Sequence, residues 1–598
     1  MSEVDGINEP PEILLLLEID SSLNRALDIA DQLNQAIRQE ISRRIVEVMK
    51  DLGIPGVLTV QIGELGTNSN RPGQFLRVHV NGLLCRYPHE LFHFIYSYLT
   101  GDYPAPGMTL SEILDWLSEA QNDGSDTASV GHQRMVEFLS LACLSIIKLQ
   151  PAVLLRSEQV AAYLDLLPFP PDNPDFRSHT LFQDSTRLCS ILREVIDLKI
   201  SIADHQAVIA ALWEARERST EDLIEYLVSA LHPDQIEIRF PLEYLKQLTR
   251  DNDKNGTNMF SYMREGLFEE LGLTYPKFRF TIADELKPDC FAFRINHLTT
   301  LPLMGLRPGQ CLVNDTADRL QLQNIKGKVT VNPATGQPAS IIDLREKDLV
   351  EKSGLTTWDQ MGYLILSFAQ VLRKNSFCFI HQEAVQNQLN QLEWGFPAIV
   401  KAVRTQASGE QLTRVLRALV AEEISIRNLR PILERLLEYD YSFSDSHRYL
   451  ILDDRPTAFG QLNAARRGDP INLVSFLRSG MKRQISNKHA RGSNTIVVYL
   501  LDLQIEESLL ASQSVQAGEK VETRLGDDVI DNILEAIRQE VAVLPPTAQR
   551  PSILTSIAVR HRLRQVIATE FPRIHVVAYQ ELAPGLNVQP IARISLNT

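Results

Sequence analysis

The sequence predicts a multidomain fold of the α+β or α/β class, in which a three-part unit occurs twice and a C-terminal α/β domain follows. Three observations lead to this prediction: the length of the chain, an internal repeat, and an unrepeated tail in which strands alternate with helices. At 598 residues the chain is too long for one hydrophobic core, because domains contain about 150 residues. Its composition, 44% hydrophobic and 23% charged, is typical of a folded globular protein.

The clearest repeat lies in two predicted helices. The stretch that begins at residue 411 has apolar residues at the spacing of one buried helical stripe: Leu412, Val415, Leu416, Leu419 and Val420. The same stripe occurs 224 residues earlier, at Leu188, Ile191, Leu192, Val195 and Ile196. Each copy continues with Ile-Ser-Ile, and we expect Ser201 and Ser425 to cap the next helix. We also expect Pro431 to lie in the first turn of that helix in the second copy.

The repeat extends toward the N-terminus. One predicted helix ends at Leu52-Gly53-Ile54, and another ends 219 residues later at Leu271-Gly272-Leu273. Glycine after a helix supplies the left-handed residue that ends it. Alternating apolar residues then predict a strand in each copy, at Leu58, Val60 and Ile62 in the first and at Phe278, Phe280 and Ile282 in the second. Because residue type, order and spacing agree, we interpret the repeat as the duplication of a whole unit.

The tail has no counterpart in the rest of the chain. Residues 494–510 predict a buried strand and a helix, residues 552–582 predict strand, helix and strand, and residues 587–596 predict a last strand. This order is typical of a small α/β domain. The predicted regions are a polar tail (1–12), a first-copy α/β region (13–125), a first-copy helical region (126–235), a second-copy α/β region with an inserted small αβ unit (236–375), a second-copy helical subdomain (376–446) and the C-terminal α/β domain (447–598).

Charge, cysteines and hydropathy exclude several classes of protein. The formal net charge of −15 argues against a nucleic-acid partner, because phosphate binding requires a concentrated basic face. The six cysteines are scattered without a CxxC pair, which favours buried thiols in a reducing compartment. The N-terminus is acidic and polar, unlike a signal peptide, and the apolar run from Phe138 ends at Lys148, short of the about 20 residues that span a membrane. We therefore expect a cytoplasmic protein without direct membrane insertion.

One stretch, His-Glu-Leu-Phe-His from His89 to His93, suggests enzyme chemistry. On a helix, His-Glu-x-x-His places two imidazoles on one face with a carboxylate beside them, as in many zinc peptidases. Glu112 could be the third ligand and Glu90 the general base, with one coordination position left open for water.

Two observations weigh against a zinc site. Pro88 directly precedes His89, which places His89 in the frayed first turn of its helix. The matching segment of the second copy, near Leu303–Pro308, has no metal-binding residues. We therefore predict no catalytic residues, no metal and no cofactor, and keep the zinc metallopeptidase as an alternative.

Several stretches of the second copy and the tail resemble, in the same order, the FHIPEP family of flagellar and type III secretion export-gate proteins. They include MREGLFEELGLTYPKFRF, INHLTTLPLMGLRPGQCLV, GLTTWDQMGYLILSFAQVLRKN, LRALVAEEISIRNLRPILE and FPRIHVVAYQEL. The resemblance covers residues 236–598 and implies the cytoplasmic half of such a protein. That half would contain an α/β layer split in sequence, an inserted αβ unit holding the LGL turn, a helical subdomain and a last α/β domain. Family members begin with transmembrane helices, which we expect this protein to lack.

The resemblance also implies a function. In the family this half assembles into a ring beneath a membrane channel, and clefts between its subdomains receive export substrates and their chaperones. We therefore expect a non-enzymatic protein that docks proteins and forms a homo-oligomer, without being the channel itself. Arg427 and Asn428 would lie at the contact between subunits; alternatively, they form a solvated helix start with an acidic neighbour near Arg427. An intracellular scaffold unrelated to secretion is a further alternative.

Two tryptophans and two turn sequences complete the expectations. We expect Trp358 and Trp394 to be core or hinge anchors, although an aromatic residue exposed at a cleft would be a docking hot spot. Arg307-Pro308-Gly309 and the segment from Asn332 to Pro338 predict turns, because glycine, proline and asparagine favour turn conformations.

Overall fold

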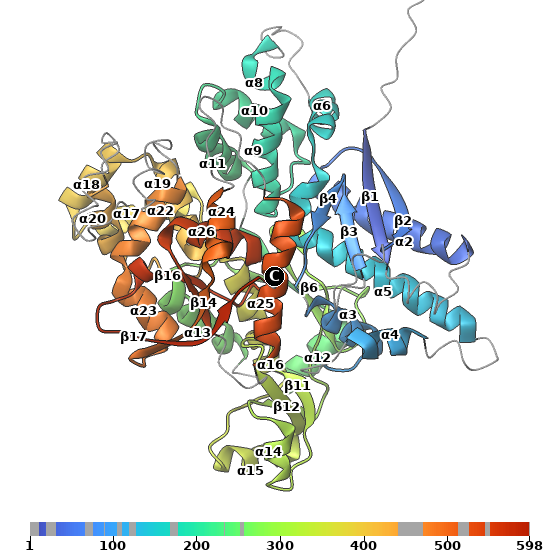
Figure 1. Cartoon of the computed structure of the whole chain (residues 1–598). Coiled ribbons are helices and arrows are strands. Elements are labelled where there is room, and N and C mark those ends of the chain that lie inside the picture. Colours follow the sequence, from blue (N-terminus) through green and yellow to red (C-terminus); the bar gives the residue numbers. More distant parts are fainter. Residues whose placement is uncertain are drawn as a thin grey trace, which may run out of the picture. The chain divides into compact units, whose positions relative to one another are not determined.

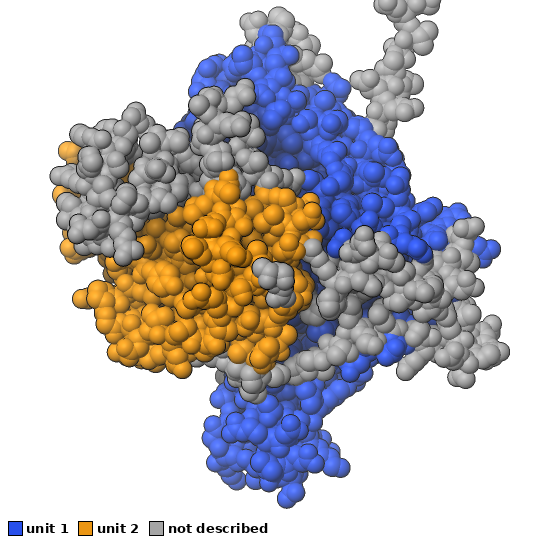
Figure 2. Space-filling view, in the orientation of Figure 1, with its two compact units in different colours: residues 1–267, 274–382 blue, residues 268–273, 383–598 orange. Residues whose placement is uncertain are grey.

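The computed structural model describes residues 11–19, 31–65, 76–88, 90–104, 110–118, 127–167, 178–231, 234–251, 256–439, 470–511, 525–544 and 551–596. The chain divides into two compact units (Figure 2). Unit 1 contains residues 1–267 and 274–382, and unit 2 contains residues 268–273 and 383–598.

Unit 1 begins with a four-stranded α/β layer. Its elements are β1 (Glu12–Ile19), α2 (Asp31–Leu52), β2 (Val57–Glu64), β3 (Leu76–Val80) and β4 (Leu83–Cys85), with the strand order β2-β1-β3-β4. β1 pairs with β2 in parallel and with β3 in the antiparallel sense. Every second residue of β1 is buried, so one face of the strand lies on the core, as its alternating sequence predicts.

A second α/β layer in the chain has the same strand order. Its elements are β5 (Ile236–Phe240), α12 (Leu242–Asp251), α13 (Gly256–Leu271), β6 (Phe278–Ile282), β7 (Cys290–Ile295), β8 (Leu298–Thr299) and β9 (Leu303–Met304). The order is β6-β5-β7-β8, again with one parallel pair, β5 with β6, and one antiparallel pair, β5 with β7. The third strand of each layer turns on a buried asparagine with positive φ, Asn81 at 53° and Asn296 at 52°. The strands predicted over residues 58–62 and 278–282 are confirmed.

A small sheet is inserted after the second layer. It contains β10 (Gln310–Val313), α14 (Ala317–Gln321), β11 (Lys328–Val331), β12 (Pro338–Asp343), α15 (Lys347–Lys352) and β13 (Thr357–Trp358), in the order β11-β12-β10-β13 (Figure 1). The sheet has a core of its own around Cys311, Leu320 and Val350. Positive φ values at Gly309 and Gly336 confirm the two predicted turns. We expected the inserted unit to hold the LGL turn, and this expectation is wrong, because Leu271-Gly272-Leu273 lies at the end of α13.

Helices follow each layer. After the first layer come α3 (Leu91–Thr100), α4 (Leu110–Ser118), α5 (Thr127–Leu149), η3 (Pro151–Leu154), α6 (Ser157–Leu166), α8 (Thr180–Gln183), α9 (Ser185–Asp197), α10 (His205–Glu214) and α11 (Thr220–Ala230). After the inserted sheet come α16 (Gln360–Lys374), η5 (Ser376–Phe379), α17 (Gln382–Glu393), α18 (Pro397–Gln406), α19 (Gly409–Ala421) and α20 (Leu429–Leu437). The stripes predicted on α9 and α19 are buried, which confirms them.

The capping residues differ from the prediction. α10 begins at His205 after the N-cap Asp204, and α20 begins at Leu429 after Asn428. Ser201 and Ser425 lie further upstream, where their hydroxyls accept hydrogen bonds from the amides two residues later, at 3.2 and 3.3 Å. The expected serine caps are therefore wrong, because these serines stabilise the turn that leads into the helix. Pro431 lies in the first turn of α20, as predicted.

The C-terminal part of unit 2 is an α/β domain. Its elements are α22 (Pro470–Gly480), α23 (Lys482–Ala490), β14 (Thr495–Leu501), α24 (Leu503–Ala511), α25 (Asp527–Ala542), β15 (Ser552–Thr555), α26 (Ile557–Ile567), β16 (Val576–Ala578) and β17 (Asn587–Ile594). The four strands pair in parallel in the order β16-β15-β14-β17. The predicted strands and helices of the tail are confirmed, and the boundary predicted at residue 446 lies outside the described residues.

The same backbone hydrogen bond is found at the C-terminal end of α2 and of α13. In unit 1 the amide of Ile202 donates to the carbonyl of Leu52 at 2.9 Å. In unit 2 the amide of Ile426 donates to the carbonyl of Leu271, also at 2.9 Å. Both amides belong to the Ile-Ser-Ile sequences, so the two repeated motifs of each half meet in space.

A glycine makes each of these contacts possible. Gly53 and Gly272 have φ values of +76° and +79°, a left-handed conformation that favours glycine. A Cβ atom on Gly53 would overlap the backbone of Ala203, and one on Gly272 would overlap the backbone of Arg427. The sequence therefore needs glycine at both positions for two separate reasons, the backbone conformation and the close approach.

The six cysteines are buried free thiols. Among the described residues, no helix combines the length and the apolar character that spanning a bilayer requires.

Candidate functional site

The described part of the His-Glu-x-x-His stretch runs from Glu90 to His93, and Leu91 to His93 lie on helix α3. We expected His89 in the first turn of its helix, but helix α3 begins at Leu91 and Glu90 is its N-cap. His89 itself lies outside the described residues. His93 is half-buried on α3, and Glu112 is exposed on α4. Within the described ranges, no group of three His, Cys, Asp or Glu side chains could hold a metal ion, and the zinc site stays a hypothesis.

Arg427 and Asn428 lie on the surface of unit 2, at the start of α20. Arg427 forms an ion pair with Glu269, and both side chains are half exposed. Asn428 is the N-cap of α20, and its side chain accepts no capping hydrogen bond. The structure therefore places an acidic neighbour beside Arg427, as the solvated-helix alternative expects, and leaves both residues accessible.

Trp394 is an exposed aromatic residue on the surface of unit 2. We expected a core or hinge anchor, but the side chain is 93% exposed at the turn between α17 and α18. Phe396 follows two residues later, and the guanidinium carbon of Arg430 lies over its ring, 4.5 Å from the ring centroid. Because Arg430 belongs to α20, the Trp394 turn and the start of α20 lie side by side (Figure 1). The three exposed residues Trp394, Arg427 and Asn428 are called the helix-end surface below.

A buried ion cluster supports this helical part from within unit 2. Arg478 on α22 forms two hydrogen bonds with Glu581, at 2.5 and 2.8 Å. Arg478 also donates to Glu422 at 3.0 Å, and Arg560 on α26 donates to the same carboxylate at 2.5 Å. Both arginines and Glu581 are buried, so four charges from distant parts of the sequence are removed from water together.

The arginines control the charge of Glu422. Burial alone would raise the pKa of this carboxyl, but the guanidinium groups of Arg560 and Arg478 outweigh burial and lower the pKa to about 2. Because breaking a buried ion pair leaves an uncompensated charge, the cluster fixes the end of α19 against the C-terminal domain.

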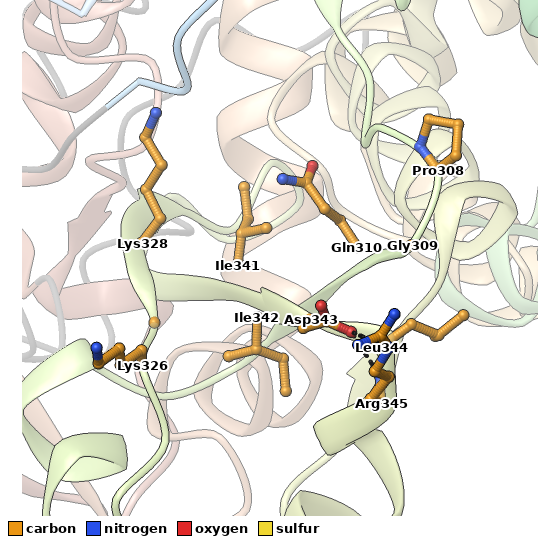
Figure 3. A pocket seen from close by; sticks show the side chains of 11 residues that line it. Pro308, Gly309, Gln310, Lys326, Lys328, Ile341, Ile342, Asp343, Leu344 and Arg345 are labelled. Atoms are coloured by element: carbon orange, nitrogen blue, oxygen red, sulfur yellow. Dashed lines mark hydrogen bonds and ion pairs between the residues drawn. The ribbon is translucent and has the colours of Figure 1, made fainter.

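A second candidate surface lies on the inserted sheet of unit 1. A cavity of about 1010 Å³ opens between β10, β11 and β12, and Figure 3 shows the side chains that line it. Lys326, Lys328 and Arg345 give it a cationic rim. Asp343 accepts a hydrogen bond from the amide of Arg345 at 2.9 Å. Such a rim suits a peptide that presents carboxylates or backbone carbonyls.

These two surfaces are candidates for contact with other proteins. An exposed tryptophan beside an arginine on rigid helix ends is typical of a protein-binding hot spot. The sequence predicted Arg427 and Asn428 but missed Trp394, because exposure depends on which helices pack around the turn.

The sequence model of the FHIPEP family matches residues 214–587, more than half of the chain, and the chain belongs to this family. Residues 1–213 lie outside the match.

Several curated proteins are similar to this chain. The chain is 27% identical over 337 residues to the low calcium response locus protein D of Yersinia pestis, which covers 56% of this chain and 44% of the relative. It is 22% identical over 374 residues to the flagellar biosynthesis protein FlhA of Bacillus subtilis, covering 62% of this chain and 51% of the relative. The chain thus spans about half the length of the curated relatives it matches.

Solved structures match the same part of the chain. The CdsV protein of Chlamydia pneumoniae is 28% identical and has a TM-score of 0.51, with 61% of this chain and 98% of that chain covered. CdsV in its complex with CdsO is 27% identical, with a TM-score of 0.52 and the same coverage.

Proposed function

We propose that this protein is a cytoplasmic docking protein of type III export, which binds other proteins beside a membrane channel and is not an enzyme. The observation that carries the proposal is the shared fold of the CdsV protein and this chain, which covers nearly all of that structure. CdsV is described in a complex with a second protein, CdsO, which supports a role in protein binding for this fold. Export substrates, their chaperones or other export components would be the partners.

We also propose that residues 13–235 are a diverged first copy of the α/β and helical parts, ahead of the second copy and the C-terminal domain. The two α/β layers have the same strand order, and the same amide–carbonyl contact follows each helix. Among the described residues, a small inserted sheet follows the second layer and not the first, and this sheet holds the cavity with the cationic rim. On this proposal the second copy retains the docking role, and the first copy has become an accessory.

The helix-end surface is the proposed contact between copies of this chain, which would close into a ring. Trp394 offers a large apolar contact, and Arg427 and Asn428 offer polar groups at its edge. A second copy is the occupant that we propose, because the exposed side chain of Trp394 offers the large apolar area that a contact between copies would bury.

Sedimentation velocity at micromolar concentration tests this proposal. We expect the wild-type chain to sediment as a multimer and Trp394→Ala to shift it toward single chains, because exposed aromatic anchors carry most of the energy of an interface. Leu322→Ala is the matched control, since Leu322 is 86% exposed and follows α14 in unit 1, so it is not part of the helix-end surface. A strict monomer, or an equal effect of both substitutions, would contradict the ring. A scaffold outside secretion would be distinguished by neighbouring genes that encode no export components.

A further inference from the structure

The end of helix α3, in the first region of the chain, lies on the second α/β layer and the inserted sheet. All the residues concerned belong to unit 1. Residues 98–104, which comprise the end of the helix and the residues after it, make hydrogen bonds with side chains or backbone groups between residues 287 and 330. The segment Gly101-Asp102-Tyr103-Pro104 is called the docked segment below.

Two cationic side chains donate hydrogen bonds to backbone carbonyls at the C-terminal end of α3. The ammonium group of Lys287 donates to the carbonyls of Tyr98 and Leu99, at 3.1 and 3.2 Å. The guanidinium of Arg307 donates to the carbonyl of Gly101 at 2.9 Å. The last carbonyls of a helix have no partner within it and carry partial negative charge, so two cations are well suited to this end.

Tyr103 is the anchor of the docked segment. Its side chain is 3% exposed, and its hydroxyl donates to Oε1 of Gln310 at 2.6 Å. The same hydroxyl accepts a hydrogen bond from the amide of Arg307 at 3.3 Å. Burial raises the pKa of the Tyr103 phenol to about 12, so the hydroxyl keeps its proton at neutral pH. A buried tyrosine whose hydroxyl is satisfied on both sides is typical of a specific binding contact.

The remaining contacts extend to the cavity of the inserted sheet. The ammonium group of Lys328 donates to Oδ1 of Asp102 at 2.6 Å, and the hydroxyl of Thr330 donates to the carbonyl of Pro104 at 3.3 Å. Lys328 and Gln310 both line the cavity, and Figure 3 shows the ammonium group of Lys328 at its rim. The docked segment therefore makes hydrogen bonds with two of the residues that line the cavity.

We propose that this face of the second layer and the inserted sheet is a peptide-binding site, and that the docked segment is its resident ligand, supplied by the same chain. The proposal rests on the proposed docking function, because it adds a way to keep one docking face closed. A partner could bind there only after α3 releases Tyr103. A ligand tethered in the same chain has a high effective concentration, so the site stays closed until a competitor outbinds it.

A peptide with the sequence of residues 96–108 tests the proposal when its binding is measured by fluorescence anisotropy. The wild-type chain should bind it weakly, because its own segment occupies the site. The Tyr103→Ala chain should bind it at least about tenfold more tightly, because the resident anchor is gone. A peptide in which the position of Tyr103 is alanine should bind neither chain.

Two lysines provide the matched control. In the Tyr103→Ala chain, Lys328→Ala should weaken peptide binding about tenfold, because its charge-assisted hydrogen bond is lost. Lys352→Ala should change it little, since Lys352 is exposed on α15 and does not line the cavity. Equal effects of the two substitutions would overturn the proposal.

A charge exchange covers the case in which Tyr103→Ala does not fold. Asp102 and Lys328 are both half exposed, so Asp102→Lys should leave the fold intact and speed hydrogen exchange at the amide of Arg307. Lys328→Asp in the same chain should restore the slow exchange. Peptide binding that is equal in wild-type and Asp102→Lys chains, or exchange that the second substitution does not restore, would overturn the inference. These results do not depend on oligomer mass, so failure of the ring would leave them interpretable.

Discussion

The turns that follow helices α9 and α19 have the same backbone, but different parts of the molecule hold them. Each contains a residue with positive φ, Lys199 at 61° and Glu423 at 55°. In unit 1 the hairpin of the second α/β layer caps the turn: the side chain of Asn296 donates to Leu198 at 2.9 Å, and the amide of His297 donates to Lys199 at 3.0 Å.

In unit 2, helix α23 of the C-terminal domain caps the corresponding turn. The ammonium group of Lys488 donates to the carbonyl of Glu423 at 2.7 Å, and the side chain of Gln484 donates to the carbonyl of Ser425 at 2.8 Å. The local sequence therefore determines the conformation of each turn, whereas the domain that packs against the turn supplies its cap. Neutral groups cap the first turn and a charge-rich surface caps the second, where Glu422 replaces Leu198.

The largest expected effect comes from the shared glycines. Gly53→Ala and Gly272→Ala should each lower the free energy of unfolding of their own unit by about 4 kcal/mol, because the new Cβ meets backbone atoms that cannot move aside. Urea unfolding followed by hydrogen exchange would assign each loss to its unit.

Gly354→Ala is the control for these substitutions. Gly354 also has positive φ, at +81°, but no described atom lies within 4 Å of its added Cβ. Its substitution should cost about 1 kcal/mol, the effect of the backbone conformation alone. If all three substitutions had equal effects, the two close contacts would contribute nothing.

Glu422→Gln should lower the stability of unit 2 and leave that of unit 1 unchanged. The loss of one carboxylate leaves Arg560 and Arg478 with less compensation in a buried site, so unit 2 should lose about 3 kcal/mol of stability and unit 1 none. Glu434→Gln, in an exposed pair with Arg430, should cost less than about 1 kcal/mol. Calorimetry of the two variants would measure the difference, and similar melting temperatures would contradict a structural role for the cluster.

The sequence predicted the parts of this architecture that depend on local pattern. The LGI and LGL helix ends, the strands after them and the stripes of α9 and α19 follow from periodicity and from the conformational freedom of glycine. The ion cluster could not be predicted, because Glu422, Arg478, Arg560 and Glu581 are brought together only by the tertiary fold. For the same reason the exposure of Trp394 and the contacts of Tyr103 had no local signal, and the serines expected as caps lie too far from the helix starts.

A moderate effect is expected from the caps themselves. Asn296→Ala should destabilise unit 1 by about 2 kcal/mol, since it removes buried hydrogen bonds and places alanine at positive φ. Lys488→Met should destabilise unit 2 by about 1 kcal/mol, because carbonyls of Glu422 and Glu423 lose a donor. Chemical unfolding monitored by hydrogen exchange would measure both, and a loss in the opposite unit would contradict the assignment of the caps.

The smallest effect concerns pH. Burial and the nearby charges of Lys488 and Arg564 lower the pKa of His575 to about 3. The folded protein therefore holds this histidine neutral, while the unfolded chain takes up a proton near its usual value, so acid favours unfolding. Between pH 7 and about pH 5.5, His575 should cost unit 2 about 1 kcal/mol, and His575→Gln should remove this share of the pH dependence. Burial also holds the pKa of His489 well below its usual value, so the share of His489 should remain. A wild-type and variant chain with the same pH profile would contradict it.

Hydrogen exchange at two amides tests the central claim, that the equivalent turns after α9 and α19 are capped by different parts of the molecule. Ile202 donates to Leu52, and Ile426 donates to Leu271, so both amides should exchange slowly. Asn296→Ala should accelerate exchange at Ile202 and leave Ile426 unchanged, whereas Glu422→Gln should do the reverse. Fast exchange at either amide in the wild-type chain, or a response of both amides to one substitution, would contradict the account.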